Sequence, residues 1–189
     1  MGGSPAEHIH RRVAEAFGLS PQEVREKSRR LMDLSKINRI SPKEFWYRLG
    51  RRLSVKDVPL LRDVWLKEFR TASSIDEKVV SLIRNLGKYK LCLLCNVSNI
   101  YDHALDSQHD LLFDEIILSY KVGCKKPEAR IYRIALIRLR LKPEECLIID
   151  DQERNLVPAR ELGFATIKYK SFNSLVKALR SFSVEIETD

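Results

Sequence analysis

The segment CLIIDD at residues 146–151 places two carboxylates directly after a run of apolar side chains. A short, continuous apolar run is typical of a strand that is buried on both faces of a parallel sheet. Three similar runs occur in the same half of the chain, and helical patterns separate them. We therefore predict an α/β fold, with helices on both faces of a parallel sheet. The predicted strands cover 91–97, 115–118, 146–149 and 165–168.

The first 72 residues carry helical patterns and no strand pattern. Ser-Pro pairs at Ser4, Ser20 and Ser41 predict three helix starts, with Ser as the cap and Pro in the first turn. Gly18 and Gly50 are expected to end the first and third of these helices, and a fourth is expected over 57–69. This pattern predicts a four-helix bundle over 1–72, followed by an α/β core over 73–189. Further helices are expected over 75–86, 101–108, 128–139, 153–162 and 174–182.

The composition narrows the classes of partner. The formal net charge is +8, but Lys and Arg alternate with acidic residues through most of the chain, so a solvated surface is favoured over a nucleic-acid site. No apolar run approaches the roughly 20 residues that cross a membrane, and the N-terminus has no signal-peptide pattern. We expect a cytoplasmic protein without a membrane partner. The cysteines of the C-x-x-C at 92–95 are interpreted as core residues, and His8 and His10 as surface residues.

Function in an open parallel sheet collects at the carboxyl ends of the strands. Asp150 and Asp151 lie at such an end, where two adjacent carboxylates repel each other unless a cation compensates them. Hard oxygen ligands of this kind suit Mg²⁺. The competing interpretation, a pair of helix-capping aspartates, has equal weight from these residues alone.

Two further polar segments follow predicted strands. Ser98, in the sequence NVSN at 96–99, is placed to bind an anion through its hydroxyl and nearby backbone N–H groups, or to act as an ordinary helix cap. Lys126 precedes Pro127, which restricts its backbone and allows the side chain to be aimed inward. An isolated lysine would more commonly lie on the surface, so the interpretation depends on the three segments occurring together.

Together these segments resemble motifs two, three and four of the haloacid dehalogenase (HAD) superfamily, in the right order and with typical gaps. The resemblance runs from Leu91 to Gly163, and the preceding helices are similar to the four-helix cap of the family. It implies a Rossmannoid parallel sheet and a Mg²⁺-dependent phosphatase that acts on a small phosphorylated metabolite. It also implies site residues: Ser98, Asn99 and Lys126 for phosphate, Asp150 and Asp151 for Mg²⁺, and catalytic roles for Ser98, Lys126 and Asp150.

One family feature has no counterpart in the sequence. Members begin with a strand that ends in Asp-x-Asp or Asp-x-Gly-Gly, and the first aspartate of this motif attacks phosphorus and forms an aspartyl-phosphate. The aspartates before Ser98 all lie in helical patterns, and Met1-Gly2-Gly3 resembles the loop that follows the nucleophile strand. We therefore expect the first central strand to be missing. The sheet would then either close by pairing its neighbours directly or take a strand from elsewhere. The aspartates concerned are Asp33, Asp57, Asp63 and Asp76.

Three hypotheses for function remain. The first is a phosphatase of the HAD type whose nucleophile strand lies outside this sequence. The second is a non-catalytic relative that keeps the phosphate and metal pocket for binding or interaction. The third is nucleic-acid binding through the arginine doublets at 11–12, 29–30 and 51–52, which would weaken steeply with salt. Neither the substrate nor the oligomeric state can be predicted from the sequence.

Overall fold

The computed structural model describes residues 4–73, 76–104 and 110–186. The chain divides into two compact units. The helical unit comprises Met1–Ser74 together with Val97–Asp106, and the α/β unit comprises Ile75–Asn96 together with Ser107–Asp189. The segment that follows the first strand therefore belongs to the helical unit, although it lies more than twenty residues beyond that unit's last helix in the sequence.

The described residues of the helical unit form four helices and one 3₁₀ segment. The three Ser-Pro pairs start helices as predicted, because the hydroxyls of Ser4, Ser20 and Ser41 each accept a hydrogen bond from the backbone N–H three residues on. Gly18 ends the first helix in a left-handed conformation, with φ of 64°. The elements are α1 (Pro5–Phe17), α2 (Pro21–Ser35), α3 (Pro42–Leu53), α4 (Val58–Ala72) and the 3₁₀ segment η1 (Asn99–Ala104).

Helix α3 does not end near Gly50, so that prediction was wrong. Gly50 is buried within the helix, which continues for three more residues to Leu53. A Cβ atom at position 50 would lie 2.6 Å from Cγ2 of Val58. The glycine therefore serves close packing between α3 and the start of α4 rather than helix termination. Ser54 supplies the left-handed residue after the helix, with φ of 57°.

Aromatic side chains form much of the core of the helical unit. Trp65 of α4 is fully buried and meets Phe45 and Trp46 of α3 edge to face. We had expected the two histidines of α1 to be surface residues, but both are partly buried. His8 Nε2 lies 2.9 Å from a carboxylate oxygen of the buried Glu68, and the half-buried ring of His10 packs edge-on against Trp65.

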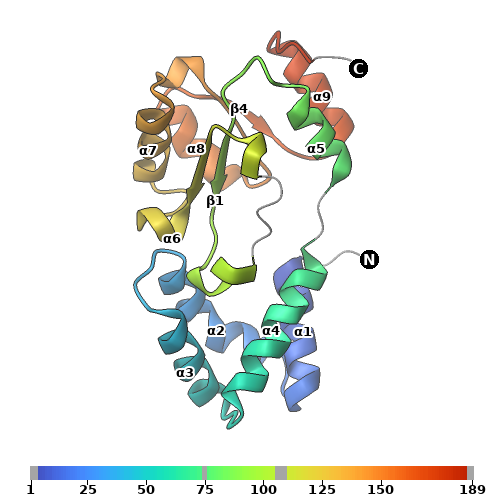
Figure 1. Ribbon diagram of the computed structural model, residues 1–189, viewed down its shortest axis with the longest axis vertical. Helices are drawn as coiled ribbons and strands as arrows, with labels where there is room; N and C mark the ends of the chain where they lie inside the picture. The colour runs from blue at the N-terminus through green and yellow to red at the C-terminus, as the bar shows by residue number, and fades with distance from the viewer. Residues whose placement is uncertain (1–3, 74–75, 105–109, 187–189) are drawn as a thin grey trace. The chain divides into compact units, whose positions relative to one another are not determined.

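Four short strands occur at the predicted places in the part of the α/β unit that the structure describes. β1 (Cys92–Cys95) pairs in parallel with β2 (Glu115–Leu118), and β3 (Leu147–Asp150) pairs in parallel with β4 (Ala165–Lys168). Helices α7 (Ala129–Leu139) and α8 (Glu153–Glu161) lie on one side of the strands (Figure 1), and α5 (Glu77–Arg84) and α9 (Phe172–Ser181) lie on the other. Helices therefore cover both faces, as the continuous apolar runs had indicated.

Short helical turns complete the described part of this unit. They are α6 (Ser119–Val122), η2 (Asp110–Leu112) and η3 (Pro143–Glu145), none of which the sequence patterns had indicated. The helix expected over 101–108 is instead the 3₁₀ segment η1 as far as Ala104, and the remainder lies outside the described residues. In the part of the chain that the structure describes, no helix is long and apolar enough to cross a membrane.

The strands form two separate pairs rather than one sheet. Within the described residues, β1 pairs with β2 alone and β3 pairs with β4 alone. Successive residues of a parallel strand direct their backbone groups to alternate sides. The Leu91 carbonyl accepts from Glu115 N–H, and the Cys146 carbonyl accepts from Ala165 N–H. The backbone groups of Cys92 and Leu94 in β1, and of Leu147 and Ile149 in β3, therefore point away from the paired strands.

Both pairs of strands share the same cores. Cys92 and Leu94 of β1 and Ile148 of β3 pack against one buried cluster, which centres on Tyr132 and Ile131 of α7. Leu91 and Leu147 pack against the cluster on the opposite side, formed by α5, α9 and the end of β4. The side chains of β1, and those of Leu147 and Ile148 in β3, are nonetheless only partly covered, and Ile149 is 39% exposed. The sheet did not close by direct pairing of β1 with β3, which was one of the two expected outcomes.

Candidate functional site

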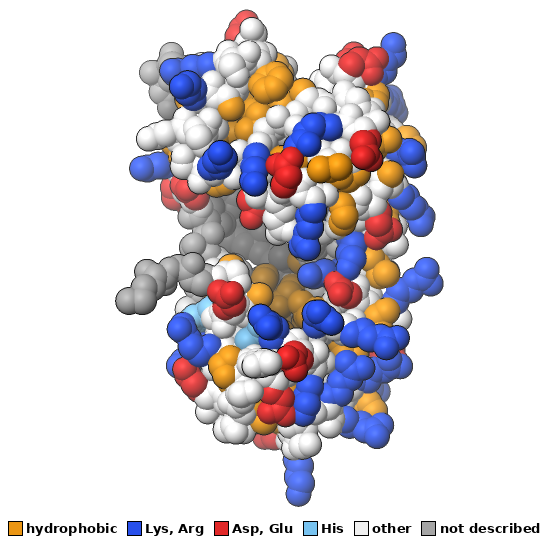
Figure 2. Space-filling view, turned by 180° about the vertical axis from the view of Figure 1, so that it is seen from behind, with side chains coloured by type: hydrophobic (Ala, Val, Ile, Leu, Met, Phe, Trp, Pro, Cys, Tyr) orange, Lys and Arg blue, Asp and Glu red, His pale blue; other side chains and the backbone are white. Residues whose placement is uncertain are grey.

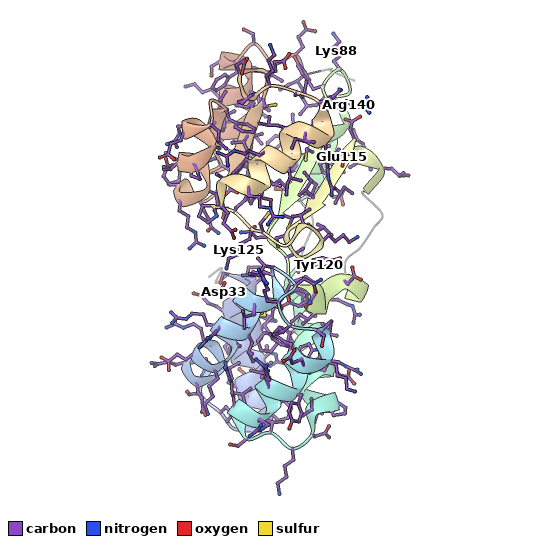
Figure 3. All side chains as sticks on the ribbon, turned by 90° about the vertical axis from the view of Figure 1, so that its left-hand side faces the viewer. Asp33, Lys88, Glu115, Tyr120, Lys125 and Arg140 are labelled. Atoms are coloured by element: carbon purple, nitrogen blue, oxygen red, sulfur yellow. The ribbon has the colours of Figure 1, made fainter. Side chains whose placement is uncertain are left out.

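The carboxyl ends of β1 and β3 are joined through Lys126. The side chain of Asn96, directly after β1, makes two hydrogen bonds to the backbone of Lys126, each 2.8 Å long: its Oδ1 accepts from the N–H and its Nδ2 donates to the carbonyl. The following Lys126–Pro127 peptide bond is cis. Within the α/β unit, Tyr120 and Lys125 lie at the end opposite Lys88 and Arg140 (Figure 3), which marks the end where this loop lies.

The Lys126 side chain reaches from this loop to the end of β3. Its Nζ donates to Oδ2 of Asp150 over 2.6 Å, and the two side chains are 13% and 5% exposed. A pair this well covered gains more from mutual attraction than a surface pair, but each partner depends on the other to compensate its desolvation. The structure thus brings together two of the residues that the sequence had singled out for chemistry.

Several hydrogen-bond donors around Asp150 keep its side chain ionised. Burial opposes its ionisation, but hydrogen bonds from Lys126, from the N–H of Gln152 and from the side chain of Asn155 outweigh burial and lower its pKa. The last two bonds both reach Oδ1, over 2.8 and 2.9 Å. Asp150 therefore carries a negative charge at neutral pH, in a fixed orientation at the strand end.

Asn155 carries a further oxygen for the site. Its Oδ1 is buried and has no hydrogen-bond donor among the described residues. Tyr132 of α7 fixes the start of α8 by donating a 2.6 Å hydrogen bond to the Asn155 carbonyl. Burial, and secondly the Asp150 charge, raise the pKa of Tyr132 to about 12, so this hydroxyl remains a donor.

These oxygens meet part of what a magnesium ion requires. Mg²⁺ commonly takes one or two carboxylates and completes its shell with waters and phosphate oxygens. The buried acceptor of Asn155 beside the Asp150 carboxylate fits such a site. Asp151, the second predicted ligand, is exposed directly after β3. No cluster of three acidic, histidine or cysteine ligands occurs in the described ranges, so at least one further ligand would come from substrate, water or another segment.

Ser98 and Asn99 lie in the helical unit. The Ser98 hydroxyl is fully buried, donates to Ser35 Oγ over 2.6 Å and accepts from the N–H of Ile100 over 3.3 Å. The second contact is the capping role that the sequence had left open beside anion binding. The Asn99 amide donates to Asn38 Oδ1 and to the Ile40 carbonyl, while its own Oδ1 is buried without a described donor.

Sequence reasoning assigned no role to several residues that build this site. Asn96 was quoted as part of a motif, yet its function as a clamp on Lys126 depends on contacts 30 residues apart. Tyr132 fell within the helix predicted over 128–139 without a role of its own, and Ser35 was given no role. The one available signal was a polar asparagine near the end of a strand predicted to be buried, since buried polar groups need partners.

Comparisons with known proteins bear on the family of this chain. A family model described as a haloacid dehalogenase-like hydrolase matches residues 6–163. The rat protein bifunctional epoxide hydrolase 2 is 42% identical over 73 residues, which is 39% of this chain and 13% of that protein. A glyceraldehyde 3-phosphate phosphatase of Methanocaldococcus jannaschii is 35% identical over 57 residues, which is 30% of this chain and 25% of that protein. The matches thus span small parts of these curated relatives.

Solved structures match nearly the whole chain. A HAD-like family hydrolase of Porphyromonas gingivalis has a TM-score of 0.77 and 26% identity, over 95% of this chain and 90% of that one. A HAD family enzyme of Bacteroides thetaiotaomicron, in a magnesium complex, has a TM-score of 0.77 and 23% identity, over 90% of each chain. The α/β fold, the ordered motifs and the family model lead to one conclusion. This chain belongs to the family of haloacid dehalogenase-like hydrolases.

Proposed function

We propose that this chain forms the phosphate- and magnesium-binding part of a phosphatase that acts on a small phosphorylated metabolite. The observation that carries the proposal is the buried Lys126–Asp150 pair, which joins the carboxyl ends of β1 and β3. Lys126 would balance the charge of a phosphoryl group, and the Asp150 carboxylate and Asn155 Oδ1 would hold Mg²⁺, with Asp151 at the rim. Bound Mg²⁺ would neutralise charge on the phosphoryl oxygens.

The nucleophile is proposed to come from a strand between β1 and β3. The backbone groups of Cys92 and Leu94 and of Leu147 and Ile149 point away from the described pairs, as they would beside an added parallel strand. Such a strand would end between Asn96 and Asp150, beside the Nζ of Lys126. An aspartate at its end would attack phosphorus and form the aspartyl-phosphate. The lysine would hold that carboxylate ionised and stabilise charge on the phosphoryl group.

A second candidate function is a non-catalytic phosphate- and metal-binding protein. The positions of the aspartates favour it: Asp57 and Asp76 cap α4 and α5, while Asp33 and Asp63 lie within α2 and α4. None of these four ends a described strand. In this alternative the pocket binds its ligands without turnover, whether or not a further strand is present. One of the named relatives is called a phosphatase and matches 30% of this chain, which supports phosphate chemistry. This partial match does not decide between the two candidate functions.

Calorimetric titration of inorganic phosphate, with and without Mg²⁺, tests the site itself. We expect binding that depends on Mg²⁺ and weakens at least about tenfold in Lys126→Met and in Asp150→Asn, since each loses a charge-assisted contact. Lys177→Met, an exposed change on α9, is the matched control and should leave binding intact. Equal binding by the wild type and both site variants would contradict the proposed pocket.

A further inference from the structure

The helical unit contains a cavity of about 310 Å³ among α1, α2, α4 and η1. This volume lies at the lower end of the range of small-molecule sites. All the lining residues belong to the helical unit. None of them takes part in the Lys126–Asp150 arrangement, so this cavity is not explained by the site proposed above.

One wall of the cavity is aromatic and firmly positioned. Trp65, which is 1% exposed, is held edge-on by Phe45 and Trp46 from the side of the core. Phe69 stacks on Tyr101 with ring centroids 3.8 Å apart and an interplanar angle of 14°. Trp65, Phe69 and Tyr101 all line the cavity. Rigid aromatic surfaces of this kind receive flat apolar groups with little loss of side-chain entropy.

A second part of the lining is cationic. Arg25 and Arg29 are four residues apart on α2, which places them on one face of the helix. His10 of α1 adds a ring nitrogen. The two arginines bring permanent positive charge to the lining, which favours a negatively charged ligand. Figure 2 shows Lys, Arg and His side chains bordering hydrophobic side chains on this face of the helical unit.

Tyr101 places a donor in the same cavity. Its hydroxyl accepts a 2.9 Å hydrogen bond from Trp65 Nε1, and no described residue accepts the hydroxyl hydrogen in turn. Burial raises the pKa of Tyr101 to about 12, so the hydrogen is retained at neutral pH. The side chain is 6% exposed, and a buried donor without an acceptor is costly. A ligand oxygen in the cavity would satisfy it.

We propose that this cavity binds an aromatic anion. The flat ring lies against Trp65, Phe69 and Tyr101, and the carboxylate or phosphoryl group of the ligand pairs with Arg25 and Arg29 at the rim. Both arginines are exposed in the free protein, which leaves their guanidinium groups accessible to such a group. The proposal goes beyond phosphate-ester hydrolysis, because binding here requires neither Mg²⁺ nor a nucleophile.

Calorimetry with non-hydrolysable probes tests the ligand class. In the absence of Mg²⁺, we expect 2-naphthoate or naphthalene-2-phosphonate to bind at least about tenfold more tightly than neutral 2-naphthol and than acetate or inorganic phosphate, since ring and charge each contribute. The stronger of the two aromatic anions identifies the preferred charged group. Binding of neither aromatic anion above the level of these controls would overturn the proposal.

Matched arginine variants test whether the aromatic anion binds in this cavity. Arg25→Gln and Arg29→Gln should each weaken the binding of the aromatic anion about tenfold, as expected for a lost charge-assisted contact. Arg30→Gln makes the same change one residue further along α2, outside the cavity, and should alter affinity less than about twofold. An equal loss in all three variants would show attraction to net charge alone and would refute the site. Tight binding of the aromatic anion by a chain that shows no Mg²⁺-dependent binding of phosphate would support this pocket and count only against the proposed function.

Discussion

At the scale of single residues, Lys126 and Asp150 depend on each other unequally. Asp150 keeps hydrogen bonds from Gln152 and Asn155 when the lysine is removed, whereas the Asp150 carboxylate is the one described side-chain partner of Lys126 Nζ. The sequence indicated both residues, because Asp150 directly follows a predicted strand and Lys126 precedes Pro127 in the segment after another. It did not indicate Asn96 as the residue that aims the lysine, since that contact joins positions 30 residues apart.

Lys126→Met should therefore lower the free energy of unfolding by about 1–3 kcal/mol, the usual cost of a lost buried contact to a charged group. The lysine lowers the pKa of Asp150, so its removal should also raise that pKa. Denaturant unfolding of the wild type, Lys126→Met and the surface control Lys177→Met measures the difference. A loss no larger than that of Lys177→Met would show that the pair does not stabilise the fold.

The thiol of Cys92 should react slowly. Burial, and secondly the Glu115 charge, raise its pKa from 9.0 to about 11, so less thiolate is present in the folded protein than in the unfolded chain at pH 9. The same shift makes the folded state less favourable as pH rises from 9.0 towards 11, because the unfolded chain then loses a proton that the folded protein retains. Iodoacetamide labelling at pH 9, followed by peptide mass mapping, measures the rate. Equal labelling of Cys92 in native and denatured protein would contradict the shift.

At the scale of elements, the sequence predicted those features that depend on residues close together in the chain. Ser-Pro pairs marked helix starts because the hydroxyl and the proline act within one turn. Gly50 was misread as a helix end because its role depends on Val58, which lies beyond the end of α3. The strands were found from their apolar runs, but their pairing into two separate sheets was not, because pairing depends on neighbours distant in the sequence.

Gly50→Ala should destabilise the protein by about 1–3 kcal/mol, although alanine favours helix, because the added Cβ would overlap Val58 Cγ2. Gly87→Ala is the control, since a Cβ there meets nothing closer than 3.9 Å. The double variant Gly50→Ala, Val58→Ala should recover part of the loss by removing the overlap. Thermal unfolding of the wild type and the three variants measures these differences in stability. If Gly50→Ala is as stable as the wild type, the packing role of the glycine is refuted.

The strand edges should show an alternating pattern of amide exchange. The N–H groups of Cys92 and Leu94 point away from β2, whereas that of Leu93 faces it. We expect the first two to exchange with deuterium faster than the third. The same comparison in β3 sets Leu147 and Ile149 against Ile148. Residue-resolved exchange by NMR measures these rates, and uniform protection along both strands would show that the edges are already covered.

At the scale of the whole molecule, the family of the chain is shown, whereas its catalytic activity is a proposal. The ordered motifs predicted the family, and the family model over residues 6–163 confirms it. The proposed activity depends on a carboxylate that none of the aspartates before Ser98 presents at the end of a described strand. The cavity in the helical unit could not be predicted either, because it is assembled from four separate elements. The net charge of +8 likewise did not indicate that Arg25 and Arg29 line this cavity.

The most direct measurement compares two N-terminally extended forms of the chain. One carries an apolar strand that ends in aspartate, and the other carries the same strand ending in asparagine. Slower exchange at Cys92, Leu94, Leu147 and Ile149 establishes that the strand lies between β1 and β3. We then predict Mg²⁺-dependent hydrolysis of p-nitrophenyl phosphate by the aspartate form, absent in the asparagine form and lost in Asp150→Ala. If the strand of the aspartate form lies between β1 and β3 but no hydrolysis occurs, the proposed enzyme is contradicted. Equal hydrolysis by both forms would contradict it as well.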